Sequence, residues 1–297
     1  MLKSVKKNKR ISFFIVSLFI IVIMVGVYCV CLWLELDVFS SVFIALGGSI
    51  IPAIISYYNC DKMVLASSGA REATREEELQ LITILDGLCL ATGLPKPKLY
   101  VMDDPSPNAF ATGRNPEHAV ICVTTGLLET LNKYELEGVI AHELSHIKNY
   151  DILLSTIISV FVGFVTILAD VFLRFGMRRT SRSRDNDSRG SASAIIALVA
   201  IIFLIVSPIA STLVQLLVSR KREYLADATA IEITRNPNGL ISALKTISDN
   251  PQRIRGASKA TAHMYISDPL KRSYTKDSIW STHPATENRI RALENIQ

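Results

Sequence analysis

The sequence contains few cysteines and few histidines, with five of each among 297 residues. None of the cysteines, at positions 29, 31, 60, 89 and 122, has the C-x-x-C spacing of a zinc or redox site. All five lie in or near apolar segments, which fits a reducing compartment or small buried side chains. The net charge of +5 comes from basic residues that are not interleaved with aromatic residues, so no nucleic-acid partner is expected.

Charged residues are also missing from four long stretches, at 11–34, 38–58, 152–169 and 191–219. An α-helix needs about 20 apolar residues to cross the hydrocarbon core of a bilayer. The first two runs and the fourth satisfy this length, whereas the third is shorter and ends at Asp170. A buried core helix is the alternative for such runs, and it is strongest for the third. The pattern predicts four hydrophobic helices and a lipid bilayer as a partner.

The basic stretch MLKSVKKNKR precedes the first run. The apolar core of a signal peptide usually has about 7–15 residues, and this run is longer. No small-x-small cleavage site follows it, so the run predicts a retained membrane anchor. Lys and Arg next to a span favour the cytoplasmic side, and the acidic turn at 35–37 suits the outside. Residues 60–150 are therefore predicted to be cytoplasmic, as are residues 220–297 if the third and fourth runs form a pair.

The segment 174–190, RFGMRRTSRSRDNDSRG, opposes this topology because it carries six arginines and two aspartates. Full crossing of the third and fourth runs places it outside, against the charge bias. Either the bias is overruled or the segments 152–173 and 191–219 do not fully cross the bilayer, and both alternatives stay open. A solvated loop that faces lipid headgroups is the expected use of this charge.

At the start of the soluble part, residues 71–94 alternate between charged and apolar residues with the spacing of an α-helix. Leu81, Leu85 and Leu88 fall on one face of this expected helix. Gly93 then ends the expected helix. Three β-branched or aromatic segments follow and predict strands at 98–103, 108–113 and 119–125. Two further helices are expected at 219–235 and 238–248, then a loop-rich stretch at 250–280 and a C-terminal helix.

The segment AHELSHI, residues 141–147, contains a two-histidine motif. It lies on a helix expected after the strand at 119–125, and the N-x-x-E pattern at Asn132 indicates where this helix starts. His142 and His146 are four residues apart, so both project from one helix face and can bind one ion. Zn²⁺ accepts such nitrogen ligands, and catalytic zinc sites use three protein ligands and a water. Glu143 lies beside the ion and can take a proton from that water.

The third ligand has to come from elsewhere in the chain, and Glu223 is the best candidate. It follows the fourth apolar run directly, as His146 precedes the third. If these runs form an antiparallel hairpin, both ends return to one membrane face and complete a His₂Glu ligand set. Asp227 is one turn further and can orient a histidine ligand. His118 and His263 have no partner pattern and are interpreted as structural or surface residues.

Four motifs occur in order, namely NAFATG, HELSH, EYLAD and THPATENRI. Together with the apolar runs they resemble the HtpX-type membrane zinc metallopeptidases, relatives of the prenyl-CAAX proteases. The resemblance implies a mainly α integral membrane protein, in which four hydrophobic helices accompany a cytoplasmic α+β zincin-like (gluzincin) protease domain with a small β-sheet. It also implies one Zn²⁺ per chain, held by His142, His146 and Glu223, with Glu143 as the general base.

The same resemblance suggests roles for the outer motifs. NAFATG is expected to be an edge strand to which an extended substrate adds, with Asn108 and Ala109 nearest the substrate. His283 is expected to stabilise the developing oxyanion, and Arg289 to pair with Asp227 or the substrate. Each of these residues also has a plain structural interpretation, as a turn residue, a cap or a solvated charge.

The resemblance thus implies a multi-pass protein of the bacterial inner membrane, with a cytoplasmic active site that degrades misfolded or unassembled membrane proteins under stress. The expected parts are two N-terminal membrane helices (1–59), the first protease segment (60–150), a membrane hairpin (151–219) and the second protease segment (220–297). The alternatives are a prenyl-CAAX-type processing protease and a non-enzymatic membrane protein with a structural zinc. Cleavage preference, regulation, self-cleavage and assembly as a homo-oligomer stay open.

Overall fold

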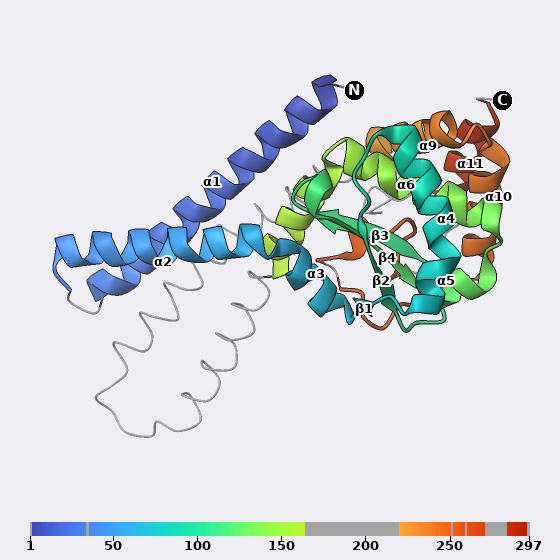
Figure 1. The fold of residues 1–297 in the computed structure, drawn as a ribbon. Coiled ribbons are helices and arrows are strands. Elements are labelled where there is room, and N and C mark those ends of the chain that lie inside the picture. The colour runs from blue at the N-terminus through green and yellow to red at the C-terminus, as the bar shows by residue number, and fades with distance from the viewer. Residues whose placement is uncertain are drawn as a thin grey trace.

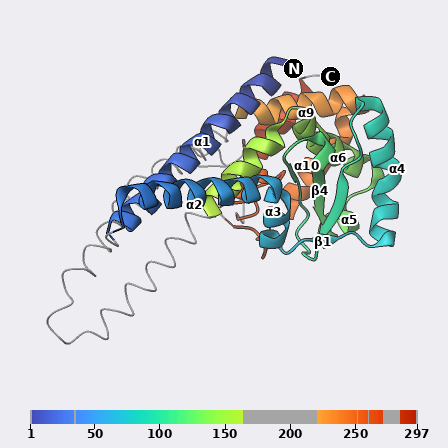
Figure 2. The ribbon, with the colours of Figure 1, turned by 60° about the vertical axis from the view of Figure 1, so that its left-hand side comes forward.

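The computed structural model describes residues 2–33, 36–163, 220–250, 252–258, 260–270 and 284–295. Figure 1 shows two long helices, α1 (Leu2–Trp33) and α2 (Val38–Tyr58), that project from a globular part containing the sheet. The N-terminal end of α1 and the C-terminal end of α2 lie close to the globular part in both ribbon views (Figure 2). The two helices therefore form an arm whose far end points away from the globular part.

The two arm helices are long and apolar enough to cross a membrane, over Val5–Val25 and Val38–Tyr58, with mean hydropathies of 2.0 and 2.2. Large apolar side chains on α2 are exposed, including Phe39 at 80% and Phe43 at 72%. The third apolar run begins as the shorter helix Asp151–Gly163. The rest of that run, the fourth run and the arginine-rich segment lie outside the described residues.

The globular part contains a four-stranded mixed sheet in the order β1-β2-β4-β3. Its strands are β1 (Arg71–Glu72), β2 (Lys98–Met102), β3 (Ala109–Gly113) and β4 (Ala119–Thr124). β2 and β4 pair in parallel, whereas β1 pairs with β2 and β3 with β4 in antiparallel fashion. The last three strands confirm the predicted ones to within one residue at each end, and β3 is the terminal strand next to the site described below.

The helices of the globular part pack around this sheet. Their bounds are α3 (Cys60–Ser68), α4 (Arg75–Thr92), α5 (Thr125–Thr130), α6 (Lys133–Lys148), α9 (Arg220–Thr234), α10 (Pro237–Asp249) and α11 (Thr286–Glu294), with short 3₁₀ turns η1 (Pro116–His118) and η2 (Ala262–Met264). The prediction of a helix from residue 71 was wrong at its start, because Arg71 and Glu72 pair with β2. Thr74 then caps α4 in a capping box with Glu77.

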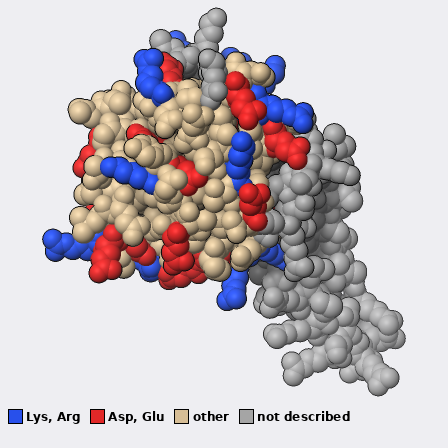
Figure 3. Space-filling model, turned by 90° about the vertical axis from the view of Figure 1, so that its right-hand side faces the viewer, with Lys and Arg blue, Asp and Glu red and all other residues tan. Residues whose placement is uncertain are grey.

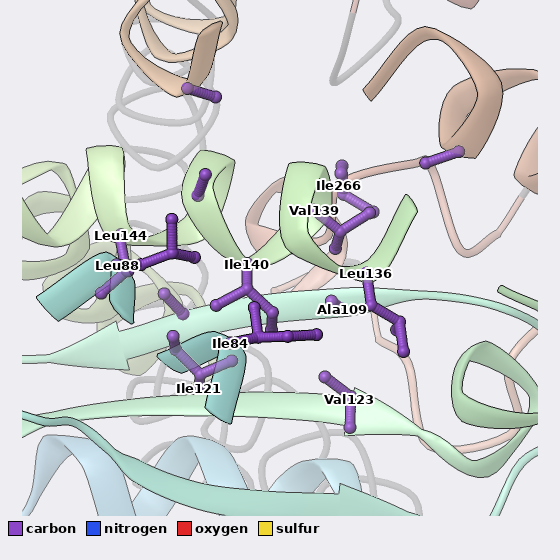
Figure 4. Packing of buried hydrophobic residues seen from close by; sticks show 14 of the residues in the cluster. Ile84, Leu88, Ala109, Ile121, Val123, Leu136, Val139, Ile140, Leu144 and Ile266 are labelled. Carbon is purple, nitrogen blue, oxygen red and sulfur yellow. The ribbon is translucent and has the colours of Figure 1, made fainter. Parts of the chain in front are cut away.

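Both faces of the sheet are buried, because alternate residues of β4 point to opposite sides. Ile121 and Val123 face α4 and α6, whereas Cys122 faces α3 and the segment around Tyr265. Figure 4 shows side chains of α6, among them Ile140, directed toward those of β4. The sheet is therefore a buried layer against which α6 packs along one side.

The surface of the globular part differs from that of the arm. Basic and acidic side chains are intermixed over the face shown in Figure 3, as is typical of contact with water. Beyond the basic first turns of α1, the arm exposes aromatic and aliphatic side chains instead. The two parts are thus suited to different surroundings.

Candidate metal and active site

α6 presents the two histidines of the HELSH motif. Asn132 caps its start, and Glu135 completes a capping box, as the N-x-x-E pattern predicted. Gly138 allows α10 to pack closely, because a Cβ there would lie 2.7 Å from the backbone nitrogen of Leu240. Between these contacts and the sheet α6 has little freedom, so the positions of its side chains are well defined.

The imidazoles of His142 and His146 point to a common position. Their Nε2 atoms are 3.2 Å apart, and His142 is fully buried. Glu223, in the first turn of α9, places its Oε2 3.7 Å from Nε2 of His142 and its Oε1 3.7 Å from Nε2 of His146. The three ligand atoms all lie within 4.8 Å of one another, which is compact enough for a single metal ion. The structure therefore brings the three predicted ligand side chains together.

The other nitrogen of His142 is held by Asp227, one turn after Glu223. Nδ1 of His142 is 2.9 Å from Oδ1 of Asp227, and Arg289 donates to both oxygens of that carboxylate at 2.9 and 2.6 Å. Burial favours a raised pKa for Asp227, but the charge of Arg289 and the hydrogen bond to His142 outweigh it and lower the pKa. Asp227 is therefore a buried anion that orients His142, and Arg289 holds Asp227 as the resemblance suggested.

His146 has a comparable partner that the sequence analysis missed. Its Nδ1 is 3.1 Å from Oδ2 of Asp151, the first residue of the helix Asp151–Gly163. Burial opposes the charged imidazole, but the hydrogen bond to Asp151 and the charge of Glu223 raise the pKa of His146 to about 9. Negative charge that attracts a proton to this place also attracts a metal cation. An acidic residue just after the motif was the available signal, but its use depends on the turn at Tyr150.

Glu143 lies next to the ligand group without belonging to it. Its side chain is buried, and its carboxylate is approached by the backbone N–H of Ala111 but has, within the described part of the chain, no hydrogen bond of ordinary geometry. Burial raises its pKa to about 7, against the lowering effect of His146 and Arg289. A buried carboxylate with unused acceptor capacity, beside two imidazoles and an acid, fits a catalytic metal site.

A pocket opens over this group. It is lined by His142, Glu143, His146 and Glu223 on one side and by residues 263–266 on another. His263, interpreted as structural or surface from the sequence, lies 9% exposed in this lining, with Nε2 3.2 Å from the carbonyl oxygen of Ser155. His118 is exposed and bonds to Asn115, as a turn residue. Nothing local in the sequence indicates that residue 263 reaches the pocket.

The NAFATG segment lies at the edge of the sheet beside the pocket, and its polar groups are partly used by the chain itself. The backbone N–H and C=O of Ala109 point away from β4, and this carbonyl accepts a hydrogen bond from the N–H of Ile266 at 2.9 Å. Its own N–H donates to Oδ1 of Asn108, whose amide donates to the carbonyl of Ser267 at 3.0 Å. Ala111, two residues further, also faces outward and lines the pocket.

The remaining predicted site residue, His283, lies outside the described residues, whereas Arg289 from the same motif is 2% exposed and central. Besides binding Asp227, Arg289 donates to the carbonyl of Ile266 at 2.8 Å. It thereby ties α11 to both α9 and the segment that lines the pocket.

Comparisons with known proteins agree with this geometry. The model of peptidase family M48 matches residues 75–297. A protein described as a protease HtpX homolog from Dictyoglomus thermophilum is 43% identical over 295 residues, covering 98% of this chain and 93% of its own length. Homologs with the same description from Caldanaerobacter subterraneus and Listeria monocytogenes are 46% and 41% identical, with 82% and 99% of this chain covered and 80% and 99% of their own lengths.

Among solved structures, the crystal structure of Ste24p from S. mikatae matches with a TM-score of 0.51 and 18% sequence identity. The match covers 99% of this chain and 65% of the Ste24p chain, so the likeness concerns the fold. The family model matches a range that includes all four motifs of the site, whereas the Ste24p match, at 18% identity, shows the fold alone. This chain therefore belongs to peptidase family M48, among its HtpX-type membrane metalloproteases.

Proposed function

We propose that this protein is a zinc-dependent endopeptidase that hydrolyses peptide bonds of misfolded or unassembled membrane proteins. The convergence of His142, His146 and Glu223, with the buried carboxylate of Glu143 beside them, carries the proposal. Two imidazoles and one carboxylate form a His₂Glu donor set typical of catalytic zinc. The peptidase family supports hydrolysis as the reaction.

Zinc bound at these three residues would polarise the substrate carbonyl and lower the pKa of a bound water to about 7. Glu143 accepts the proton of the attacking water and passes it to the leaving amine. Burial raises the pKa of this carboxyl above its ordinary value, which makes its carboxylate a stronger base for the first step. Asp227 and Asp151 fix the orientations of the two imidazoles.

The substrate is proposed to bind as an extended segment along the outer edge of β3. Main-chain hydrogen bonds at a sheet edge read extended shape rather than sequence, which suits unfolded chains. Ala111 is the position we assign to this contact, because it lines the pocket, whereas the outward groups of Ala109 are bonded within the chain and Phe110 pairs with Tyr265. His283 is proposed as the oxyanion donor, a role typically worth about 2.7–4 kcal/mol.

The location proposed is the bacterial inner membrane, with the active site on the cytoplasmic side. α1 and α2 expose apolar side chains of the kind that face lipid, and the basic residues before the first span favour a cytoplasmic N-terminus. Because the N-terminal end of α1 and the C-terminal end of α2 both lie close to the globular part, the site then faces the same compartment as the N-terminus.

Glu143→Gln tests the mechanism. The amide cannot accept the proton, so cleavage of an unfolded membrane-protein substrate should fall by about 10²–10⁴-fold while bound zinc, measured by atomic absorption, stays at one per chain. Glu137→Gln, on the same helix and outside the pocket, should cleave like the unaltered protein. Glu223→Gln should lose both zinc and cleavage. Full activity of Glu143→Gln, or a protein that binds no zinc before any substitution, would contradict the proposal.

A further inference from the structure

The first turns of α1 reach the metal site from the other end of the sequence. Asn8 is 5% exposed, and its Nδ2 donates to Oδ1 of Asp151 at 2.6 Å and to the carbonyl of Asn149 at 3.0 Å. Asp151 uses its other oxygen for Nδ1 of His146 at 3.1 Å. A continuous chain of hydrogen bonds therefore runs from α1 through one carboxylate to a metal-ligand side chain.

The place that Asn8 contacts is the corner where α6 ends. Tyr150 there has a φ of +58°, a left-handed conformation that is uncommon for a residue with a large side chain. The ammonium of Lys9 lies 4.0 Å from the centre of the Tyr150 ring, a cation–π contact. Two successive residues of α1 thus contact three successive residues of the corner, which over-determines a backbone that is not intrinsically favoured.

α1 continues alongside the helix that follows this corner. The rings of Phe19 and Phe161 meet edge-on with centroids 5.0 Å apart. From Asn8 to Phe19 is eleven residues, and from Asp151 to Phe161 is ten, so the two helices advance by about 16.5 and 15 Å between the two contacts. The helices therefore lie in matching register, and sliding α1 by one turn breaks both contacts together.

The chemistry of the corner selects an amide at position 8. Both partners of its Nδ2, a carbonyl and a carboxylate, are acceptors, so the side chain has to supply two N–H donors. The guanidinium of Arg222 also lies near Asp151, but its Nη1 is 3.9 Å from Oδ1, well beyond the 2.6 Å of the Asn8 amide. Asn8 is thus the close neutral donor that fixes the Asp151 carboxylate without competing for its charge.

We propose that Asn8 is a positioning residue of the metal site, which holds His146 through Asp151 and makes metal affinity depend on α1 being docked. The inference rests on the proposed zinc site. Docking of the N-terminal membrane helix and completion of the protease site are then one event, since a displaced α1 leaves Asp151 less constrained and His146 free to rotate away from the common position.

The test is zinc affinity of the full-length protein in detergent, measured by competition with a chelating dye. Asn8→Leu should bind zinc about tenfold more weakly, at the lower end of the range for partners of metal ligands. Ser12→Ala, one turn later on the same buried side of α1, is the matched control and should bind zinc normally, because within the described residues its hydroxyl has no hydrogen-bond partner. Asn8→Asp removes both donors at equal size and should weaken binding at least as much as Asn8→Leu.

Coupling distinguishes positioning from a general loss of structure. Asp151→Ala should weaken zinc binding by up to about a hundredfold, and adding Asn8→Leu to it should change nothing more, because the two act through one contact. Normal zinc affinity of Asn8→Leu and Asn8→Asp, or an undiminished tenfold loss in the Asp151→Ala background, would overturn the inference. Absence of zinc binding by the unaltered protein would overturn the proposed function instead.

Discussion

α2 and α6 are helices of one molecule with opposite distributions of polarity. α2 exposes Phe39 and Phe43 and carries no charged residue, whereas α6 buries His142 and Glu143 in the centre of the globular part. Exposed apolar area is unfavourable in water and favourable in lipid, and buried ionisable groups are costly unless they are paired or bind a metal. The exposed apolar side chains of α2 therefore indicate contact with a bilayer. The buried ionisable side chains of α6 indicate a metal-dependent active site.

The buried charges of the site are expected to give the largest effect. Arg289→Leu leaves Asp227 buried without its cation, which should lower the free energy of unfolding by about 3–5 kcal/mol. Lys245→Ala removes the cation from a half-exposed pair with Glu294 on α11, whose atoms are 3.8 Å apart, and should cost only about 0–1 kcal/mol. Chemical denaturation in detergent measures both, and equal losses would show that burial does not distinguish the two pairs.

A new charged residue should be costly on the surface of the arm and nearly neutral on the surface of the globular part. Phe43→Asp places a carboxylate on a face that is expected to contact lipid, at a cost of about 3 kcal/mol for insertion. Leu90→Asp changes a residue that is 88% exposed on α4 and should alter stability by no more than about 0.5 kcal/mol. Alkaline extraction of membranes reports the first variant. If Phe43→Asp stays as firmly inserted as Leu90→Asp, then α2 does not face lipid at that position.

A surface ion pair on the globular part should give the smallest effect. Hydrogen bonds from Arg71 lower the pKa of Glu77 to about 2, and Glu77 also completes the capping box of α4. Glu77→Ala should therefore cost about 1 kcal/mol near pH 7. Because the folded-state pKa is below the unfolded value of about 4.3, this contribution is present above pH 4.3 and is lost as the pH falls toward 2.

Thermal unfolding of Glu77→Ala at pH 7 and at pH 2.5 checks the sign, with a smaller difference expected at the lower pH. Glu76→Ala is the control, since this neighbour in the same helical turn is exposed. A loss for Glu76→Ala as large as that for Glu77→Ala would assign the effect to helix charge in general rather than to the pair with Arg71.

The parts of the site that could be predicted are those that depend only on the spacing of residues within one helix. His142 and His146 share a face because they are four residues apart on a capped helix, and the same helical spacing places Asp227 one turn after Glu223. Asp151 and His263 were missed because their roles depend on a tight corner at Tyr150 and on a loop that folds back over the pocket. Neither feature has a periodic pattern that a sequence displays.

The sequence alone therefore determined the local features: which stretches become helices, where these are capped and which of their faces are apolar. It also determined that one helix carries two imidazoles and a carboxylate side by side. Only the tertiary structure decided what those groups meet. Arg289 reaches Asp227 across 62 residues, and Asn8 reaches Asp151 across 143. Contacts at such separations depend on the path of the whole chain, and burial then gives them their strength, because a hydrogen bond or charge pair shielded from water is not exchanged for water.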